Sequence, residues 1–67
     1  MYSDNTKEMA RKITRMYTGD LFAMEYPVEF VSKADLTKGK LLGGPWFNCV
    51  ALVETPKGPL IRGTNGK

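Results

Sequence analysis

The sequence predicts a small, mainly β domain with one N-terminal α-helix, in which a bent antiparallel sheet curls into an open barrel. Three observations support this fold class. Apolar residues recur at helical spacing before residue 18, the chain after Gly19 holds several short β-prone runs, and glycine or proline separates those runs. Short strands with such connections are typical of small sheets and barrels, and a helix can cover one open end.

The first segment predicts a helix over about residues 4–17. Asn5 and Glu8 have the spacing of a capping box, and Gly19 can take the left-handed conformation that ends a helix. Large and small apolar residues fall on one stripe of this helix. We expect the stripe to pack against the sheet through Met9, Ala10, Ile13, Met16 and Tyr17.

The chain after Gly19 first passes through a segment with two open interpretations. Asp20 can begin a further helical turn over residues 20–26, or the same residues can form an extended lead-in, because Tyr26 precedes Pro27. Beyond this segment the alternation of apolar and polar residues predicts four strands. We expect them over residues 27–33, 38–43, 46–54 and 59–63.

The central strand is expected at residues 46–54, a run that is mostly apolar at both its odd and its even positions. A strand of this kind is covered on both faces. A tight turn then leads into the last strand. If Thr55 lies opposite Pro59, Leu52 lies opposite Arg62, and these two side chains share one face of the sheet.

The composition limits how such a chain can be stabilised. It has 67 residues, one cysteine, no histidine and a net charge of +3, so neither a disulfide nor a structural zinc is expected. A domain this small is marginally stable alone, and we therefore expect a homo-oligomer. The sequence shows no leader peptide or membrane span, which together with the free thiol leads us to expect a cytoplasmic protein that does not contact a membrane.

Residues that carry enzyme chemistry are sparse in this chain. Cys49 lies within an expected strand, where an inert buried thiol is expected. The seven acidic residues are scattered, and the glycines at 39, 43 and 44 are not followed by the Lys-Ser/Thr pair of a phosphate-binding loop. We therefore expect a non-enzymatic protein with no catalytic residue, no cofactor and no metal.

Two short motifs stand in order in the second half of the chain. Gly39-Lys40-Leu41 leads into Trp46-Phe47-Asn48, and later Leu60-Ile61 is followed by Arg62-Gly63-Thr64-Asn65. This ordered pair resembles the two signatures of Sm and Sm-like proteins. The resemblance implies an SH3-like or Sm-like open barrel, a homo-oligomeric ring of about five to seven subunits, and binding of single-stranded, uridine-rich RNA.

The resemblance also implies a pocket for one RNA base. It assigns this pocket to Trp46, Asn48 and Arg62, with Gly63 shaping the loop and Asn65 behind. The indole and guanidinium planes would stack on the base while the amide reads its edge. Each residue also has a simpler interpretation. Trp46 could fill one end of the barrel, Asn48 could sit in a turn or bulge, and Arg62 could pair across strands with Glu54.

A row of basic residues follows the expected helix opposite its apolar stripe. Lys7, Arg11 and Arg15 are spaced by four, so they project from the same side. Such a row can contact the phosphates of RNA, or it can simply form a solvated helix face.

The chain departs from the Sm-like pattern at three places, one of which is Pro45, because proline is unusual in the loop before Trp46. Gly44 occupies a position where the family often has aspartate, and the family's ring-closing fifth strand would follow Asn65, where two residues remain. Either the ring closes differently or the chain continues. The competing hypothesis is a small, non-enzymatic protein-interaction module of phage type. It would bind a host protein through a sheet edge or through the helix.

Overall fold

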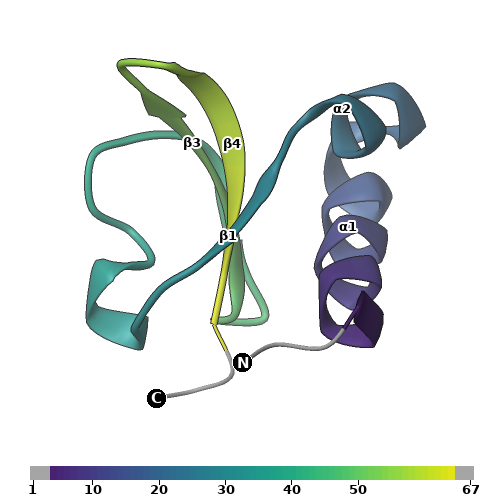
Figure 1. Cartoon of the computed structure of the whole chain (residues 1–67), viewed down its shortest axis with the longest axis horizontal. Helices are drawn as coiled ribbons and strands as arrows, with labels where there is room; N and C mark the ends of the chain where they lie inside the picture. Colours follow the sequence, from purple (N-terminus) through teal and green to yellow (C-terminus); the bar gives the residue numbers. More distant parts are fainter. Residues whose placement is uncertain (1–3, 65–67) are drawn as a thin grey trace.

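The computed structural model describes residues 4–64, which form one four-stranded sheet with helices on one face and an irregular connection on the other (Figure 1). This arrangement confirms the N-terminal helix and the small sheet. The elements are α1 (Asp4–Thr18), α2 (Asp20–Glu25), β1 (Val28–Phe30), the 3-10 helix η1 (Lys33–Asp35), β2 (Lys40–Trp46), β3 (Val50–Thr55) and β4 (Gly58–Gly63).

The two helices are separated by a single glycine. Gly19 has a φ of +100°, a conformation that is open to glycine and rarely adopted by other residues, and it ends α1 where the sequence indicated. The next segment takes the helical alternative and forms α2. Tyr26 then becomes extended, with φ −96° and ψ 139°, because Pro27 disfavours the helical conformation in the residue before it.

The side of α1 that meets the sheet differs from the expected stripe. Ala10 is buried, Ile13 packs against the same core, and Thr14 is buried with its hydroxyl donating to the Ala10 carbonyl at 2.8 Å. Met9 and Met16 are 56% and 67% exposed, so the expectation that both methionines fill the core was wrong. Small residues at positions 10 and 14 let α1 approach the sheet closely. The helix is therefore rotated about its axis relative to the expected stripe, and the two methionines lie on its flank.

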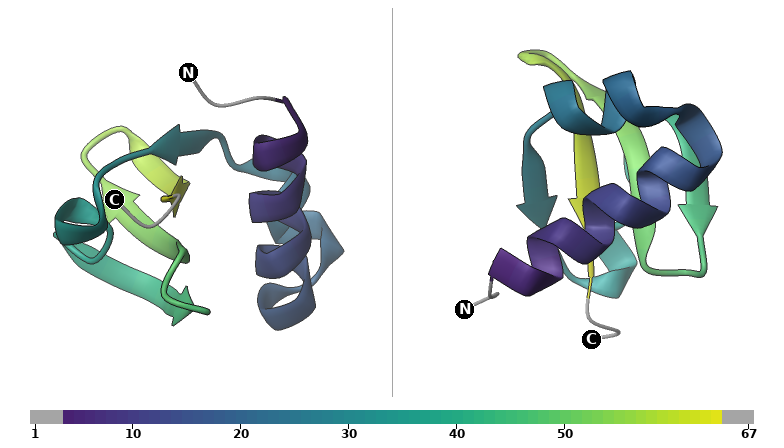
Figure 2. Two further views of the ribbon diagram at one scale, coloured as in Figure 1. Left: turned by 90° about the horizontal axis from the view of Figure 1, so that it is seen from below. Right: turned by 90° about the vertical axis from the view of Figure 1, so that its right-hand side faces the viewer.

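The sheet has the strand order β1-β4-β3-β2 and remains open, with β1 and β2 at its two edges. The expectation of a wholly antiparallel sheet was wrong at one edge, because β1 runs parallel to β4 with Val28 opposite Ile61. After β1, the connection through η1 crosses one face of the sheet to the far edge before β2 begins (Figure 2). That crossing is what allows β1 and β4 to point the same way.

The expected strand over residues 46–54 is in fact a hairpin. Trp46 ends β2 and lies opposite Val50, while Phe47 and Asn48 form the turn with φ values of 54° and 56°. The Cys49 amide donates to the Trp46 carbonyl at 3.1 Å and closes this turn. Apolar composition continues through the reversal, so the sequence pattern did not reveal it. Asn48 is a turn residue, as one of its two interpretations proposed.

The second hairpin is shifted by one residue from the expected register. Thr55 lies opposite Gly58, and its hydroxyl donates to the Gly58 carbonyl at 2.7 Å. A shift of one residue moves every side chain to the other face of a sheet. Leu52 is therefore opposite Ile61, and Arg62 is opposite Ala51 on the other face.

Each face of the sheet carries its own small core. On the helix face, Ala10 packs with Val50, Leu52 and Ile61, and Trp46 lies against this group. On the loop face, Leu36 from the connection covers Ala51 and Val53, with Val31 and Leu60 at the margin. Figure 2 shows α1 crossing the helix face obliquely. Leu42 of β2 remains 47% exposed.

Candidate functional site

The expected base pocket is not assembled within one subunit. Trp46 packs against the helix-face core, whereas Arg62 is bonded to the connection on the loop face. Asn48 lies in the exposed turn between β2 and β3. The sheet therefore separates the indole from the guanidinium, and the two cannot sandwich one base.

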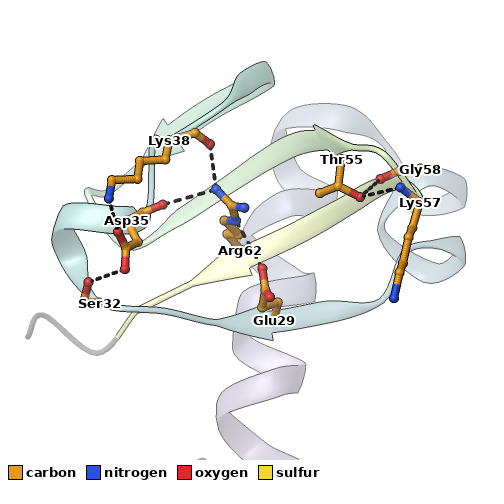
Figure 3. Close-up of polar contacts among 8 residues, drawn as sticks. All are labelled: Glu29, Ser32, Asp35, Lys38, Thr55, Lys57, Gly58 and Arg62. Atoms are coloured by element: carbon orange, nitrogen blue, oxygen red, sulfur yellow. Dashed lines mark hydrogen bonds and ion pairs between the residues drawn. The ribbon is translucent and has the colours of Figure 1, made fainter.

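Arg62 instead holds the connection onto the sheet (Figure 3). Its Nε donates to Glu29 Oε2 at 3.2 Å, and its Nη1 donates to the carbonyls of Asp35 and Lys38 at 3.2 and 2.6 Å. The Arg62 side chain is 19% exposed, while its partner Glu29 is 49% exposed. The alternative partner Glu54 pairs with Lys40 at 3.5 Å instead. Arg62 thus has a structural role in this fold.

The connection is also tied to itself beside Arg62. The Asp35 carboxylate accepts a hydrogen bond from the Ser32 hydroxyl at 3.0 Å and lies 2.8 Å from Lys38 Nζ. The bond from Lys38, followed by the bond from Ser32, holds the pKa of Asp35 below its usual value of 3.8. These contacts fix the turn whose carbonyls accept hydrogen bonds from Arg62.

Gly63 marks a close approach of β4 to the Phe30 ring and α1. A Cβ atom at this position would lie 2.9 Å from Cε1 of the Phe30 ring and 3.7 Å from Cβ of Ala10. The missing side chain lets the Phe30 ring and α1 pack against β4. Its role here is in packing, and Asn65 lies outside the described residues.

The basic row on α1 is only partly solvated. Lys7 and Arg15 are exposed, and Arg15 Nε lies 3.6 Å from Asp20 Oδ1. Arg11 is half-buried, and its Nε has no hydrogen-bond partner among residues 4–64. A shallow hollow of about 310 Å³ lies among Glu8, Arg11, Lys12 and Arg15. The row can present charge to a polyanion, but Glu8 and Asp20 lie beside it.

An aromatic group gathers where the C-terminal end of α1 meets the tip of the first hairpin. The Tyr17 and Trp46 rings are stacked, with centroids 5.2 Å apart and planes 7° apart. The Phe47 ring meets Tyr17 edge-on at 5.9 Å. Tyr17 is 51% exposed and Phe47 is 64% exposed, so the group stands largely at the surface.

An apolar hollow lies next to this aromatic group. It has a volume of about 370 Å³ and is lined by Thr18, Phe22, Tyr26, Leu42 and Leu52. Phe22 and Tyr26 contact one another at 6.0 Å, yet Phe22 and Leu42 each remain about half exposed, at 48% and 47%. Thr18 links the hollow to the neighbouring Tyr17. We call Tyr17, Phe22, Leu42, Trp46 and Phe47 together the apolar patch.

Sequence reasoning missed the apolar patch because it assigned the aromatic residues to a core or to a base pocket. A signal was present in the segment of α2. Three of its six residues, Leu21, Phe22 and Met24, are large and apolar, and all three are exposed while only Ala23 is buried. A single turn-and-a-half of helix on a small sheet cannot bury side chains on every side.

The free edge of β2 borders the patch but is poorly suited to receive another strand. Pro45 lacks the amide that a new strand would need. Register irregularities also interrupt the strand between Leu41 and Gly43 and between Gly43 and Trp46. Bulges and proline are common protections against edge-to-edge pairing. The side chains of the patch are therefore the more accessible feature of this edge.

Other kinds of site have little support in the described part of the chain. Among residues 4–64, no three His, Cys, Asp or Glu side chains are grouped as metal ligands. Within the same range, no helix has the length and apolar character required to cross a bilayer. Comparison with protein-family models, curated proteins and solved structures finds no match to this chain.

Proposed function

We propose that this protein is a small, non-enzymatic protein-interaction module that binds its partner through the apolar patch. The observation that carries the proposal is the exposure of aromatic and aliphatic side chains around one apolar hollow. Contiguous apolar patches are uncommon on monomeric proteins, and they often mark interaction sites. Tyrosine, tryptophan and phenylalanine are also enriched at the centres of protein interfaces.

The distribution of large apolar residues supports this proposal. Nine of them are exposed in residues 4–64, whereas five large aliphatic residues are buried: Leu36, Val50, Leu52, Val53 and Ile61. In a protein that binds no other surface, so high a ratio of exposed to buried large apolar residues would bring no benefit, because exposed apolar side chains promote aggregation. Binding a partner removes much of that surface from water and contributes free energy in proportion to the area buried.

Of the two binding modes considered for such a module, docking on the helix face is better supported than strand addition. The hollow lies between α2 and β2 on the helix face, and it offers apolar walls on both sides. Strand addition would require a regular run of free amides along β2, where Pro45 and two irregularities interrupt the strand. An apolar side chain from the partner, rather than its backbone, would then provide the main contact.

The proposal is tested by selecting binding peptides and mapping their site. Peptides from a random display library are selected against the folded protein, and the strongest is titrated into isotope-labelled protein while amide and methyl chemical shifts are recorded. We expect the largest shifts at Phe22 and Leu42 and at least tenfold weaker binding to Phe22→Ala. Met9→Ala is the matched control, because Met9 is an exposed apolar residue on α1 that lies outside the patch. Shifts centred on another surface would contradict the proposal.

The ring-forming, RNA-binding hypothesis is the competing proposal, and one observation favours it. Tyr17 and Phe47 expose aromatic rings at the surface. Exposed rings can stack on unpaired bases. Fluorescence anisotropy with labelled oligo-U and oligo-A at fixed salt tests it. Binding that prefers oligo-U and weakens in Tyr17→Ala would support RNA, and no binding to either oligomer would leave the protein-interaction module.

A further inference from the structure

We propose that the apolar patch joins two copies of this chain around a two-fold axis, with the Phe47 ring of each copy seated in the hollow between Phe22 and Leu42 of the other. The inference rests on the proposed function, because it uses the same patch as a docking surface. It goes further by naming the occupant, which is a second copy of the chain.

Phe47 is the protruding part of the patch. Its ring is 64% exposed at the tip of the first hairpin, and its ring contact with Tyr17 is edge-on at 5.9 Å. Its backbone has a φ of 54°, a left-handed conformation that costs a residue with a side chain roughly 1–2 kcal/mol. A bulky residue in this region is unusual, and glycine would avoid the cost. One copy alone gives Phe47 little contact in return, whereas a second copy would bury its ring.

The hollow beside Tyr17 is the receiving part of the patch. Its volume is about 370 Å³, and four of its five lining side chains are aromatic or aliphatic: Phe22, Tyr26, Leu42 and Leu52. An apolar cavity of about 150 Å³ is large enough to hold benzene. The hollow therefore has room for a phenyl ring, and its lining offers that ring no charged group.

The protruding ring and the hollow are both close to Tyr17. Tyr17 contacts Phe47 through its ring and is followed by Thr18, which lines the hollow. A two-fold axis near Tyr17 would place each Phe47 over the hollow of the other copy, so that both contacts form at once. Such an interface is isologous, and it closes after two copies without leaving a free binding site.

The exposed apolar area is of the size that such a dimer needs. Large side chains bury about 150–250 Å² when fully covered, so each half- to two-thirds-exposed residue here offers on the order of 100 Å². Four residues of the patch and the neighbouring Met16 and Leu21 are in this range of exposure. Together they offer on the order of 600 Å² per copy, and a typical stable interface buries about 800 Å² per partner. Polar residues at the rim can supply the difference.

Electrostatics distinguishes a second copy from a polyanion or an acidic protein. The patch contains no charged residue, and each copy has a net charge of +3. Salt screens the repulsion between two such copies and does not weaken apolar contacts. The dimer should therefore be as strong or stronger at high salt, whereas binding to RNA should weaken as salt rises.

The first measurement is sedimentation equilibrium of the wild-type chain at low and high salt. We expect a mass of twice the 7.5 kDa chain at high concentration, with no loss of association as salt is raised. Phe47→Gly removes the ring while keeping a residue that adopts its backbone conformation freely, and it should weaken association by about 30-fold or more. Met9→Ala, outside the patch, should associate like the wild type.

The second measurement tests the reciprocal contact directly by mixing two variants. Phe47→Lys places an ammonium on the protruding side, and Leu42→Glu places a carboxylate in the hollow. Each variant alone should be monomeric, because both of its contacts bury an unpaired charge. An equimolar mixture should recover dimers, since one contact is then wild-type and the other pairs Lys with Glu. Circular dichroism checks that each variant is folded.

The outcomes separate this inference from the proposed function. A monomeric wild type, a dimer that Phe47→Gly leaves intact, or a mixture that stays monomeric would each overturn the two-fold dimer. A mass of about five to seven copies would overturn it in favour of a ring. If the chain is monomeric but selected peptides still shift Phe22 and Leu42, the protein-interaction proposal stands without the dimer. If the chain is monomeric and those peptides bind elsewhere, both proposals fail.

Discussion

The two faces of the sheet are covered in different ways. On the loop face, an irregular connection covers a small core and is fixed by Arg62, Asp35 and Lys38 through hydrogen bonds. On the helix face, two helices cover a larger area, but they leave aromatic and aliphatic side chains at the surface. In residues 4–64, the hydrogen bonds of Arg62 and Asp35 lie on the sealed face, and most of the exposed large apolar side chains lie on the helices of the other face.

This difference shows which face carries the fold and which face is available for binding. Hydrogen bonds to backbone carbonyls fix the position of a segment, because they require particular distances and directions. Apolar contact between α1 and the sheet is less directional, so it tolerates side chains that remain partly uncovered. Substitutions on the loop face should therefore reduce stability, and substitutions in the apolar patch should mainly affect association.

The largest effect is expected from Leu36→Ala on the loop face. Leu36 is 2% exposed, and its removal should leave a cavity that lowers the free energy of unfolding by about 2–5 kcal/mol. Leu21→Ala is the matched change on the helix face, where Leu21 is 68% exposed, and it should change stability by less than about 0.5 kcal/mol. Urea denaturation followed by circular dichroism measures both. Equal losses would break the distinction between the faces.

Arg62→Ala should give the next largest loss. It removes the donors to Glu29 and to the carbonyls of Asp35 and Lys38, and we expect a destabilisation of about 2–3 kcal/mol. Arg62→Lys should recover only part of it, because one ammonium cannot reproduce the geometry of the guanidinium. The exposed Arg15→Ala serves as control and should be near neutral. A stable Arg62→Ala protein would favour a binding role for this residue over a structural one.

Gly63→Ala should destabilise the chain by about 1–3 kcal/mol, because the added methyl group would lie 2.9 Å from the Phe30 ring. The loss should shrink when Phe30→Leu is combined with it, since the smaller side chain leaves room for the methyl group. Thermal denaturation of the two single variants and the double variant measures this coupling. Strictly additive losses would mean that the strain arises elsewhere.

The smallest effect is expected at Asp35, and it should depend on pH. Its pKa is lowered in the folded state, so its ionised form stabilises the fold above the ordinary value of 3.8, and this contribution is lost as the pH falls through the lower folded value. Asp35→Asn should therefore be slightly less stable than the wild type at pH 7, and the difference should fade in acid. A difference that is constant from pH 7 to pH 2 would show that charge is not its origin.

Local features of the fold were accessible from the sequence, and features set by distant contacts were not. The helix over residues 4–17 and its end at Gly19 follow from local periodicity and from a residue with a strong conformational preference. The parallel pairing of β1 depends on a crossing connection that no local pattern encodes. The turn at Phe47 was hidden because bulky residues rarely occupy left-handed backbone conformations.

The expected site failed for a related reason. Placing Trp46 and Asn48 on one strand, next to Arg62, required a continuous strand and a particular hairpin register. The reversal at Phe47 and the one-residue shift at Thr55 removed both conditions. Once Arg62 faces the connection, its donors meet backbone carbonyls there and are no longer free for a ligand.

The parallel pairing of β1 with β4 also has a consequence for how the chain folds during synthesis. β4 is the last strand of the described chain, yet it lies between β1 and β3, and Glu29 meets Arg62 across 33 positions of sequence. β2 and β3 can pair as a local hairpin as soon as they leave the ribosome, but β1 has no neighbour until β4 has emerged. Contacts between distant segments form late, because closing a long loop costs entropy. β1 therefore stays unpaired until β4 has emerged from the ribosome.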